Sequence, residues 1–238
     1  MAAITSLNAL VEALREGAPV NKVLISRSPR DAKVALVIDL CRRRRVVFQL
    51  VPAEAIDRKA GARHQGVWAE VAPVSFCSLE EMLVAARTGL VVVLDGIEDT
   101  GNLGAIVRTA AAVAADGVLL SVRGSAPVND TTWKTSAGAL AKVRLVQAHN
   151  LAQDVAKLKE GGYWVVAADQ HAGTRFYDFD FRGRTAVILG NEGKGVSPLL
   201  KKKADQLLAI PHAPAVESLN VSAAAAIILF EAYRQKNR

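Results

Sequence analysis

The chain has 238 residues, 51% of them hydrophobic, and carries a formal net charge of +7. This length suits two domains, and the basic charge favours a polyanionic partner such as a nucleic acid, although many basic proteins are merely soluble. No segment has the roughly 20 consecutive apolar residues of a membrane span, and Met1–Asn8 lacks a signal-peptide pattern, so we expect a cytoplasmic protein without a membrane partner.

The first 72 residues alternate between helical and strand patterns. Apolar residues at helical spacing predict a helix over Leu7–Glu16. Asp31 is placed to cap a second helix that runs to about Arg44, and Pro52 suits the first turn of a short helix ending near Arg58. The residues of the second helix expected to face the core are Ala35, Leu36, Ile38 and Leu40. Strands are predicted at Lys22–Ser26, Val46–Leu50 and Val67–Val71.

Positive charge concentrates in this first α/β module. Arg42–Arg45 is an uninterrupted run of four arginines, whereas a solvated helix end would usually mix both signs of charge. We therefore expect a surface that binds a polyanion such as a nucleic acid, with a merely solvated helix end as the alternative. The residues assigned to nucleic-acid binding are Arg42, Arg43, Arg44, Arg45, Arg63 and His64 in this module, together with Lys134 further along the chain.

A linker at residues 73–78 separates residues 1–72 from a second domain over residues 79–238. Ser78 and Glu81 have the spacing of a capping box for a helix over Ser78–Arg87. Strands typical of a buried parallel sheet are then predicted at Leu90–Leu94, Gly117–Ser121, Val143–Val146, Trp164–Ala168, Thr185–Leu189 and Gln206–Ile210. Helices are predicted at Gly101–Ala114, Ala152–Lys159, Leu199–Ala204 and Asn220–Gln235, and Asp130–Ala139 is helical or irregular. This alternation predicts an open parallel sheet with helices on both faces.

Three polar or glycine-rich segments follow strands of this sheet, where ligands bind in open α/β folds. In the first, Asn102 and Arg108 lie on a predicted helix whose start suits a phosphate, although a capped helix with a surface arginine is the plainer interpretation. The second, Gly190–Gly195, resembles a phosphate-binding loop, but no Ser or Thr follows Lys194, which argues against a nucleoside triphosphatase. The third, Ile210–Ser222, reads by itself as a stiff loop and a capped helix start.

Together the three segments resemble the motifs of the SpoU (TrmH-like) RNA ribose 2′-O-methyltransferases. The matching residues are Asn102-x-Gly104-x-x-x-Arg108, Gly190-Asn-Glu192-x-x-Gly195, and Ile210-Pro211 with Ser218-Leu219-Asn220-Val221-Ser222. The resemblance covers about residues 79–235 and implies an α/β-knot fold, a parallel sheet with a deep C-terminal trefoil knot. The first module resembles an L30e-like domain. His64-Gln65-Gly66-Val67 resembles a signature of the RlmB-like subgroup, which methylates a guanosine of 23S ribosomal RNA.

The resemblance also implies a cofactor and roles for particular residues. S-adenosylmethionine would be bound by Leu189, Gly190, Ile210, Leu219, Ser218 and Asn220. Arg108 would be the essential arginine, which binds the phosphate beside the target and stabilises the developing alkoxide. Asn102 would orient Arg108 or the ribose. Glu192 would hold Asn102 or the knot loop, with direct action as a base as the alternative.

The terminal helix is apolar nearly all round, so most of its sides must be covered. The resemblance implies a homodimer that covers it, and burial within one chain is the alternative. His212 and Pro214 depart from the family pattern inside the cofactor loop. The four histidines and two cysteines lack the spacing of metal ligands, so no metal is expected. Alternative functions are a tRNA methyltransferase, an antibiotic-resistance methyltransferase acting on another ribosomal nucleotide, and a catalytically silent RNA-binding relative.

Overall fold

The computed structural model describes residues 2–27, 33–61, 64–71, 74–213, 215 and 218–237. Asp31, Arg63 and Pro214, each singled out by the sequence, lie outside these residues. The chain forms two compact units, Met1–Val74 with Pro127–Lys142, and Ser75–Ala126 with Val143–Arg238. The predicted division at residues 73–78 assigns the segment Pro127–Lys142 to the second domain. The contacts of this segment instead group it with the first unit.

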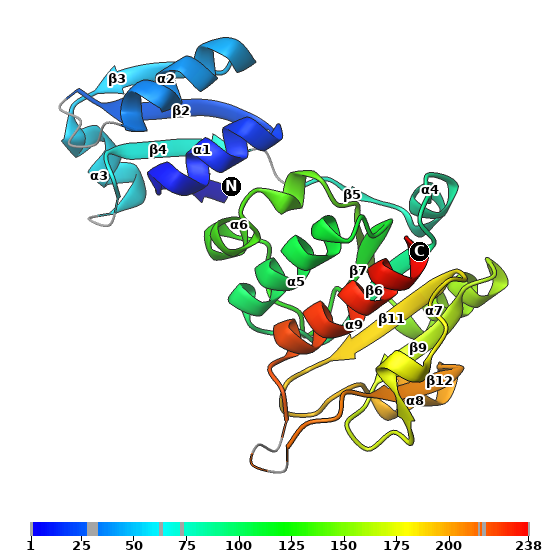
Figure 1. The fold of residues 1–238 in the computed structure, drawn as a ribbon. Coiled ribbons are helices and arrows are strands. Elements are labelled where there is room, and N and C mark those ends of the chain that lie inside the picture. The colour runs from blue at the N-terminus through cyan, green and yellow to red at the C-terminus, as the bar shows by residue number, and fades with distance from the viewer. Residues whose placement is uncertain are drawn as a thin grey trace. The chain divides into compact units, whose positions relative to one another are not determined.

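The first unit is built on a four-stranded sheet with strand order β1-β4-β2-β3. The strands are β1 (Ala2–Ile4), β2 (Val20–Ser26), β3 (Val47–Val51) and β4 (Val67–Val71). β2 and β3 are parallel, and β4 is antiparallel to both of its neighbours. Two helices, α1 (Leu7–Glu16) and α2 (Lys33–Arg44), pack against each other on the sheet, and α3 (Ala53–Ala60) contacts β2 and β4 (Figure 1).

Packing in the first unit corrects two details of the prediction. The buried face of α2 is formed by Val34, Val37 and Cys41, so the predicted inward face is wrong: Ala35 is exposed and the other three residues are half-buried. The buried residues follow i, i+3, i+7 spacing, and contact with α1 selects this side of a helix that is apolar on several sides. Pro52 is the N-cap of α3 and precedes its first turn.

The segment Pro127–Lys142 adds α6 (Asp130–Ser136) and a short 3₁₀ helix, η1 (Ala139–Ala141), to the first unit. α6 contacts β1, and η1 contacts α1. Lys142 forms an ion pair with Glu16 at the end of α1. Sequence patterns record local structure only, so this long-range pairing was not visible in them.

The second unit contains an eight-stranded sheet in which every described pairing is parallel. Its strand order is β10-β12-β9-β11-β6-β7-β8-β5. The strands are β5 (Phe76–Cys77), β6 (Leu90–Asp95), β7 (Gly117–Ser121), β8 (Leu145–Ala148), β9 (Trp164–Ala168), β10 (Thr174–Arg175), β11 (Thr185–Gly190) and β12 (Gln206–Ala209). The predicted parallel α/β sheet is confirmed. β5 and β10 have two residues each and left no strand pattern to detect.

Helices cover both faces of this sheet, as its continuous apolar strands require. α4 (Leu79–Val84), α7 (Leu151–Glu160) and α8 (Pro198–Lys203) contribute to one core cluster with β6, β9 and β11. On the other face, α5 (Thr100–Ala112) and α9 (Val221–Lys236) lie side by side, with α5 on β7 and α9 on β11 (Figure 1). The predicted capping box of Ser78 and Glu81 is present, although α4 ends at Val84 rather than Arg87. In the part of the chain that the structure describes, no helix is long and apolar enough to cross a membrane.

Candidate functional site

Parallel strands β6, β9, β11 and β12 end at the same edge of the second sheet, and polar loops follow them. The loop after β11 is anchored to the end of β6. Asn191 Nδ2 donates to Gly96 O at 2.9 Å, and the backbone N–H of Ser197 donates to Asp95 Oδ2 at 2.7 Å. These bonds fix a turn that also contains a bridge between Asn191 and Gly195.

Gly190 shows why the second segment is rich in glycine. A Cβ at this position would overlap the backbone of Gly195 and Val196. The loop therefore folds tightly back onto the end of its own strand, which only glycine permits at the crossing. This packing differs from an open phosphate-binding loop, in agreement with the missing Ser or Thr after Lys194.

The three sequence segments meet in one hydrogen-bonded cluster of side chains. Glu192 Oε1 accepts from Asn102 Nδ2 at 2.7 Å and from Asn220 Nδ2 at 2.5 Å. Asn220 Nδ2 also lies 3.1 Å from Asn102 Oδ1. We call Asn102, Glu192 and Asn220 the amide–carboxylate cluster. Because its members are 28 to 118 residues apart in the chain, the cluster joins three segments that no local pattern connects.

Helix caps position two members of this cluster. Asp99 is the N-cap of α5, and its Oδ1 accepts from the backbone N–H of Asn102 at 2.7 Å. Asn220 is the N-cap of α9, and its Oδ1 accepts from the N–H groups of Ser222 and Ala223. The side-chain NH₂ of Asn220 is thereby turned toward Glu192, while its oxygen satisfies the start of the helix.

Arg108 lies apart from the cluster. It follows Asn102 by six residues on α5, which places it about 120° around the helix axis and roughly 9 Å further along it. Its side chain is exposed and does not line the cavity described below. With the residues that the structure describes, its guanidinium makes no hydrogen bond or ion pair.

A cavity of about 400 Å³ opens beside the amide–carboxylate cluster at the ends of β9, β11 and β12. Its apolar lining includes Leu189, Leu208, Ile210, Leu219, Val221 and Ala224. Five of the six residues assigned to the cofactor line it: Leu189, Gly190, Ile210, Ser218 and Leu219. Asn220 does not, but it contacts Glu192, which does.

A polar wall of this cavity lies outside the three motif segments. Asp169, immediately after β9, pairs with Lys201 of α8, with 2.7 Å between Oδ2 and Nζ. Hydrogen bonding from Lys201 lowers the pKa of Asp169, and the backbone N–H of His171 adds a bond to Oδ1 at 2.8 Å. The signal in the sequence is a polar residue directly after a buried parallel strand, the same signal that marks the neighbouring loops.

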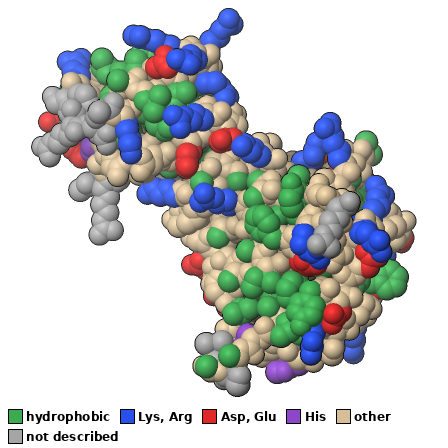
Figure 2. Space-filling view, viewed as in Figure 1, with side chains coloured by type: hydrophobic (Ala, Val, Ile, Leu, Met, Phe, Trp, Pro, Cys, Tyr) green, Lys and Arg blue, Asp and Glu red, His purple; other side chains and the backbone are tan. Residues whose placement is uncertain are grey.

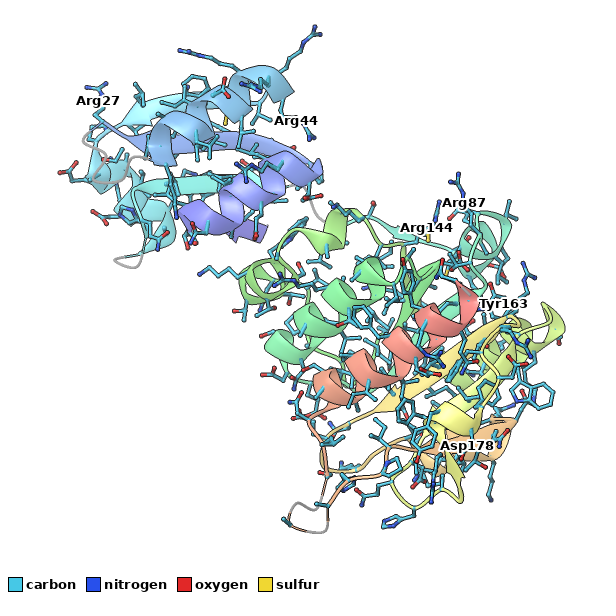
Figure 3. All side chains as sticks on the ribbon, in the orientation of Figure 1. Arg27, Arg44, Arg87, Arg144, Tyr163 and Asp178 are labelled. Atoms are coloured by element: carbon cyan, nitrogen blue, oxygen red, sulfur yellow. The ribbon has the colours of Figure 1, made fainter. Side chains whose placement is uncertain are left out.

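In the first unit the arginine run divides into different environments. Arg44 Nη1 donates to Leu14 O at 3.0 Å, so this side chain binds the C-terminal end of α1 (Figure 3). Arg43 pairs with Asp39 at 2.9 Å but stays mostly exposed. The guanidinium of Arg42 lies 6.0 Å from the ring centre of Phe48, and Arg45 is exposed.

His64 and Lys134, also assigned to RNA, differ in exposure. The His64 side chain is only 10% exposed; its Nε2 lies 2.9 Å from Asp57 Oδ1, and its Nδ1 accepts from Gly66 N–H. Both ring nitrogens are thus occupied within the unit. Lys134 is exposed on α6. Figure 2 shows Lys and Arg side chains around hydrophobic ones on the visible face of this unit.

Cys41 and Cys77 are free, and burial raises the pKa of Cys41 to about 11. Across the described ranges of the chain, no group of three or more His, Cys, Asp or Glu side chains is placed to hold a metal ion.

Family models match both parts of the chain. The model of the SpoU rRNA Methylase family matches residues 89–230, and the model described as RNA 2′-O ribose methyltransferase substrate binding matches residues 7–77. The chain is 36% identical over 239 residues to a relative from Staphylococcus haemolyticus named as a TrmH family tRNA/rRNA methyltransferase, with 99% of this chain and 96% of the relative covered. A relative of the same name from Staphylococcus aureus is 34% identical over 238 residues and covers 98% of this chain and 96% of its own.

Solved structures share this fold over almost the whole chain. The SpoU methyltransferase AviRb from Streptomyces viridochromogenes, in complex with AdoMet, superposes with a TM-score of 0.82 at 24% identity, covering 99% of this chain and 90% of that one. An AdoMet-bound rRNA methyltransferase from Sinorhizobium meliloti has a TM-score of 0.78 at 24% identity, with 98% and 86% covered.

Proposed function

The chain belongs to the SpoU rRNA methylase family, and from this premise we propose that it transfers a methyl group from S-adenosylmethionine to a ribose 2′-hydroxyl of structured RNA. The observation that carries the proposal is the cavity of about 400 Å³, whose wall includes Glu192 of the amide–carboxylate cluster. A site for a small cofactor thus adjoins the residues that connect all three motif segments.

The residues of the cavity fit S-adenosylmethionine. Cavities of about 300–1,000 Å³ hold ligands of this size, and they combine apolar walls with a few placed polar groups. Backbone groups of Leu189, Gly190, Ile210 and Leu219 would bind the adenine and ribose, while the apolar side chains would cover the base. When bound, the sulfonium supplies the methyl group together with a neutral leaving group. The chain itself must align the ribose oxygen and assist loss of its proton.

Glu192 acts by holding the loops together. Its Oε1 accepts from both Asn102 and Asn220, so removal of the carboxylate would free two amide groups at once. The amide of Asn102 is occupied on both sides, by Glu192 and by Asn220, which favours a positioning role over direct contact with the ribose. The cluster therefore fixes the position of the cofactor loop relative to the start of α5.

Arg108 binds the phosphate beside the target nucleotide and stabilises the developing alkoxide. A guanidinium suits both tasks because it stays protonated and presents several donors. Since Arg108 does not line the cavity of its own chain, we propose that it acts at the cavity of the partner subunit in a homodimer.

The surface of α9 supports this homodimer. Ile227, Phe230 and Tyr233 form a stripe at helical spacing with exposed fractions of 37%, 49% and 40%. Its own chain therefore leaves one side of this apolar helix uncovered. α5, which carries Arg108, packs directly beside α9, so a subunit seated on the stripe would lie close to that arginine.

The first unit binds the RNA substrate through Arg42, Arg43, Arg45 and Lys134, which are exposed. Arg44 is also exposed, but its guanidinium donates to Leu14 O, and His64 is engaged within the unit, so these two side chains support the surface indirectly. A guanosine of 23S ribosomal RNA is the proposed target. It rests on the His64–Val67 signature, and a tRNA or another ribosomal nucleotide remains the alternative. The expected place of action is the cytoplasm.

Two measurements test the proposed function. Calorimetry should show that the purified protein binds S-adenosylmethionine, and incubation with methyl-labelled cofactor should transfer label to ribosomal RNA more than to tRNA. Cofactor binding without transfer to any RNA would favour a catalytically silent relative. Absence of cofactor binding would refute the enzyme assignment of this chain.

A further inference from the structure

A carboxylate outside the three family motifs stands in the wall of the cavity. Asp169 directly follows β9, and its backbone N–H donates to Leu208 O in β12 at 3.0 Å. β9 lies between β11 and β12 in the sheet. Asp169 is therefore placed between the strand ends that lead to Gly190 and Ile210. A ligand bound by the loops at Gly190 and Ile210 would therefore lie beside the Asp169 carboxylate.

Two donors hold the Asp169 carboxylate in place but do not occupy all of its hydrogen-bond acceptor sites. Its side chain is only 10% exposed, Lys201 Nζ lies 2.7 Å from Oδ2, and His171 N–H donates to Oδ1. An ionised carboxylate offers about four acceptor sites, so about two stay available for a ligand. A nearly buried acceptor in a cavity wall is costly unless a donor satisfies it.

We propose that Asp169 accepts hydrogen bonds from the ribose 2′- and 3′-hydroxyls of the cofactor, and that Lys201 positions its carboxylate. The inference rests on the proposed cofactor. A vicinal diol presents two adjacent O–H donors, which match the remaining acceptor sites of one carboxylate. Acidic side chains near the ends of parallel strands recognise nucleotide ribose in unrelated α/β folds by the same chemistry.

The charge of the surroundings favours a hydroxyl over the ammonium group of the cofactor. Lys201 already neutralises Asp169, and Lys194 lines the same cavity. A second cation on the same carboxylate would meet the repulsion of Lys201 at close range. Neutral O–H donors gain a charge-assisted hydrogen bond without that repulsion.

The test compares S-adenosylhomocysteine with its 2′,3′-dideoxy analogue by calorimetry. The wild type should bind the dideoxy analogue roughly 10- to 100-fold more weakly, the loss expected for hydrogen bonds to a charged group. Asp169→Ala should weaken S-adenosylhomocysteine to a similar degree and should no longer distinguish the two ligands. Equal affinity of the wild type for both ligands would overturn the proposal, as would an equal loss for both in the variant.

Controls separate the diol from other roles of this carboxylate. Asp180→Ala removes a carboxylate that also pairs with a cation, Arg182 at 2.7 Å, but lies outside the cavity; it should leave affinity unchanged. 5′-Methylthioadenosine keeps the diol and lacks the amino-acid group, so Asp169→Ala should weaken it too; an unchanged affinity would assign Asp169 to the ammonium and refute the proposal. The comparison in the wild type needs no variant, so a misfolded variant does not block the test. If the wild type binds no S-adenosylhomocysteine, the proposed cofactor itself fails.

Discussion

At the scale of single residues, the motif positions fall into two groups. Asn102, Glu192 and Asn220 share one cluster, whereas Arg108 stands alone on the surface of α5. The sequence motifs predicted all four residues but not this separation. Its cause is the spacing of six residues between Asn102 and Arg108, which places the two side chains on different faces of the helix. Asp169 was missed because it belongs to none of the motifs.

Arg108→Ala should reduce methyl transfer by at least about 100-fold, as loss of a transition-state donor does, and change cofactor affinity little. Turnover with RNA and calorimetry with S-adenosylmethionine measure the two effects. Arg123→Ala, which removes another exposed arginine of the same unit, is the matched control. Retained turnover in Arg108→Ala would contradict the role assigned to this guanidinium.

Glu192→Gln and Glu192→Ala distinguish positioning from proton transfer. A glutamine keeps an acceptor for the two asparagine amides, so Glu192→Gln should retain most activity, whereas Glu192→Ala should lose about 10- to 100-fold in kcat/KM. If Glu192 were the base, both variants would lose activity to the same extent. Steady-state kinetics of the two variants measure the difference.

At the scale of elements, long patterns were predicted well and short ones were not. Leu7–Glu16 forms a helix and Trp164–Ala168 a strand over the predicted residues, because each repeats its apolar spacing several times. β1, β5 and β10 have two or three residues and no period to detect. Their pairing depends on neighbouring strands that sequence patterns do not identify.

The signature His64–Val67 also gains a physical meaning at this scale. His64 holds the turn before β4, and Gly66 adopts a φ of 74° there. Gln65 Oε1 accepts from the backbone N–H of Leu7 at 2.9 Å and so satisfies the start of α1. These contacts explain the residues by folding of the first unit, which makes the signature a weaker guide to the RNA target than to the fold.

The end of α2 carries a prediction that separates its arginines. Replacing Arg42 and Arg45 by alanine should lower RNA affinity. The slope of the logarithm of the binding constant against the logarithm of the salt concentration should decrease in magnitude by about 2, since two phosphate contacts are lost. Arg44→Ala should instead lower the unfolding temperature, because it leaves Leu14 O at the end of α1 without its partner. Filter binding across a salt series and thermal melting measure these effects. An unchanged salt slope in the double variant would identify the run as a solvated helix end.

At the scale of the whole molecule, the α/β class of both domains was predictable, but the grouping of a later segment of the chain with the first unit was not. The parallel sheet followed from the alternation of strands and helices, while the grouping of Pro127–Lys142 with the first unit depends on contacts such as Lys142 with Glu16. The trefoil knot and the homodimer stay predictions, since they concern the path of the chain through space and a second copy.

Mixed dimers test whether Arg108 acts across the subunit interface. Arg108→Ala supplies an intact cavity, and Glu192→Ala supplies an intact arginine. If the site combines both subunits, dissociation and reassociation of the two impaired variants should raise activity above that of either variant alone, up to about a quarter of wild-type activity, the share of complete sites at random pairing. No restored activity after verified exchange of subunits would place Arg108 at the cavity of its own chain.

Methyl transfer to a ribose 2′-hydroxyl of RNA is tested by locating the methyl group in the product. Ribosomal RNA from a deletion strain, treated with purified protein and S-adenosylmethionine, should gain one 2′-O-methylguanosine in 23S RNA that alkaline hydrolysis cannot cleave on its 3′ side. RNA treated with Arg108→Ala should not gain it. A methyl group found on a base, or none found in any RNA of that strain, would refute the proposed ribose 2′-O-methylation.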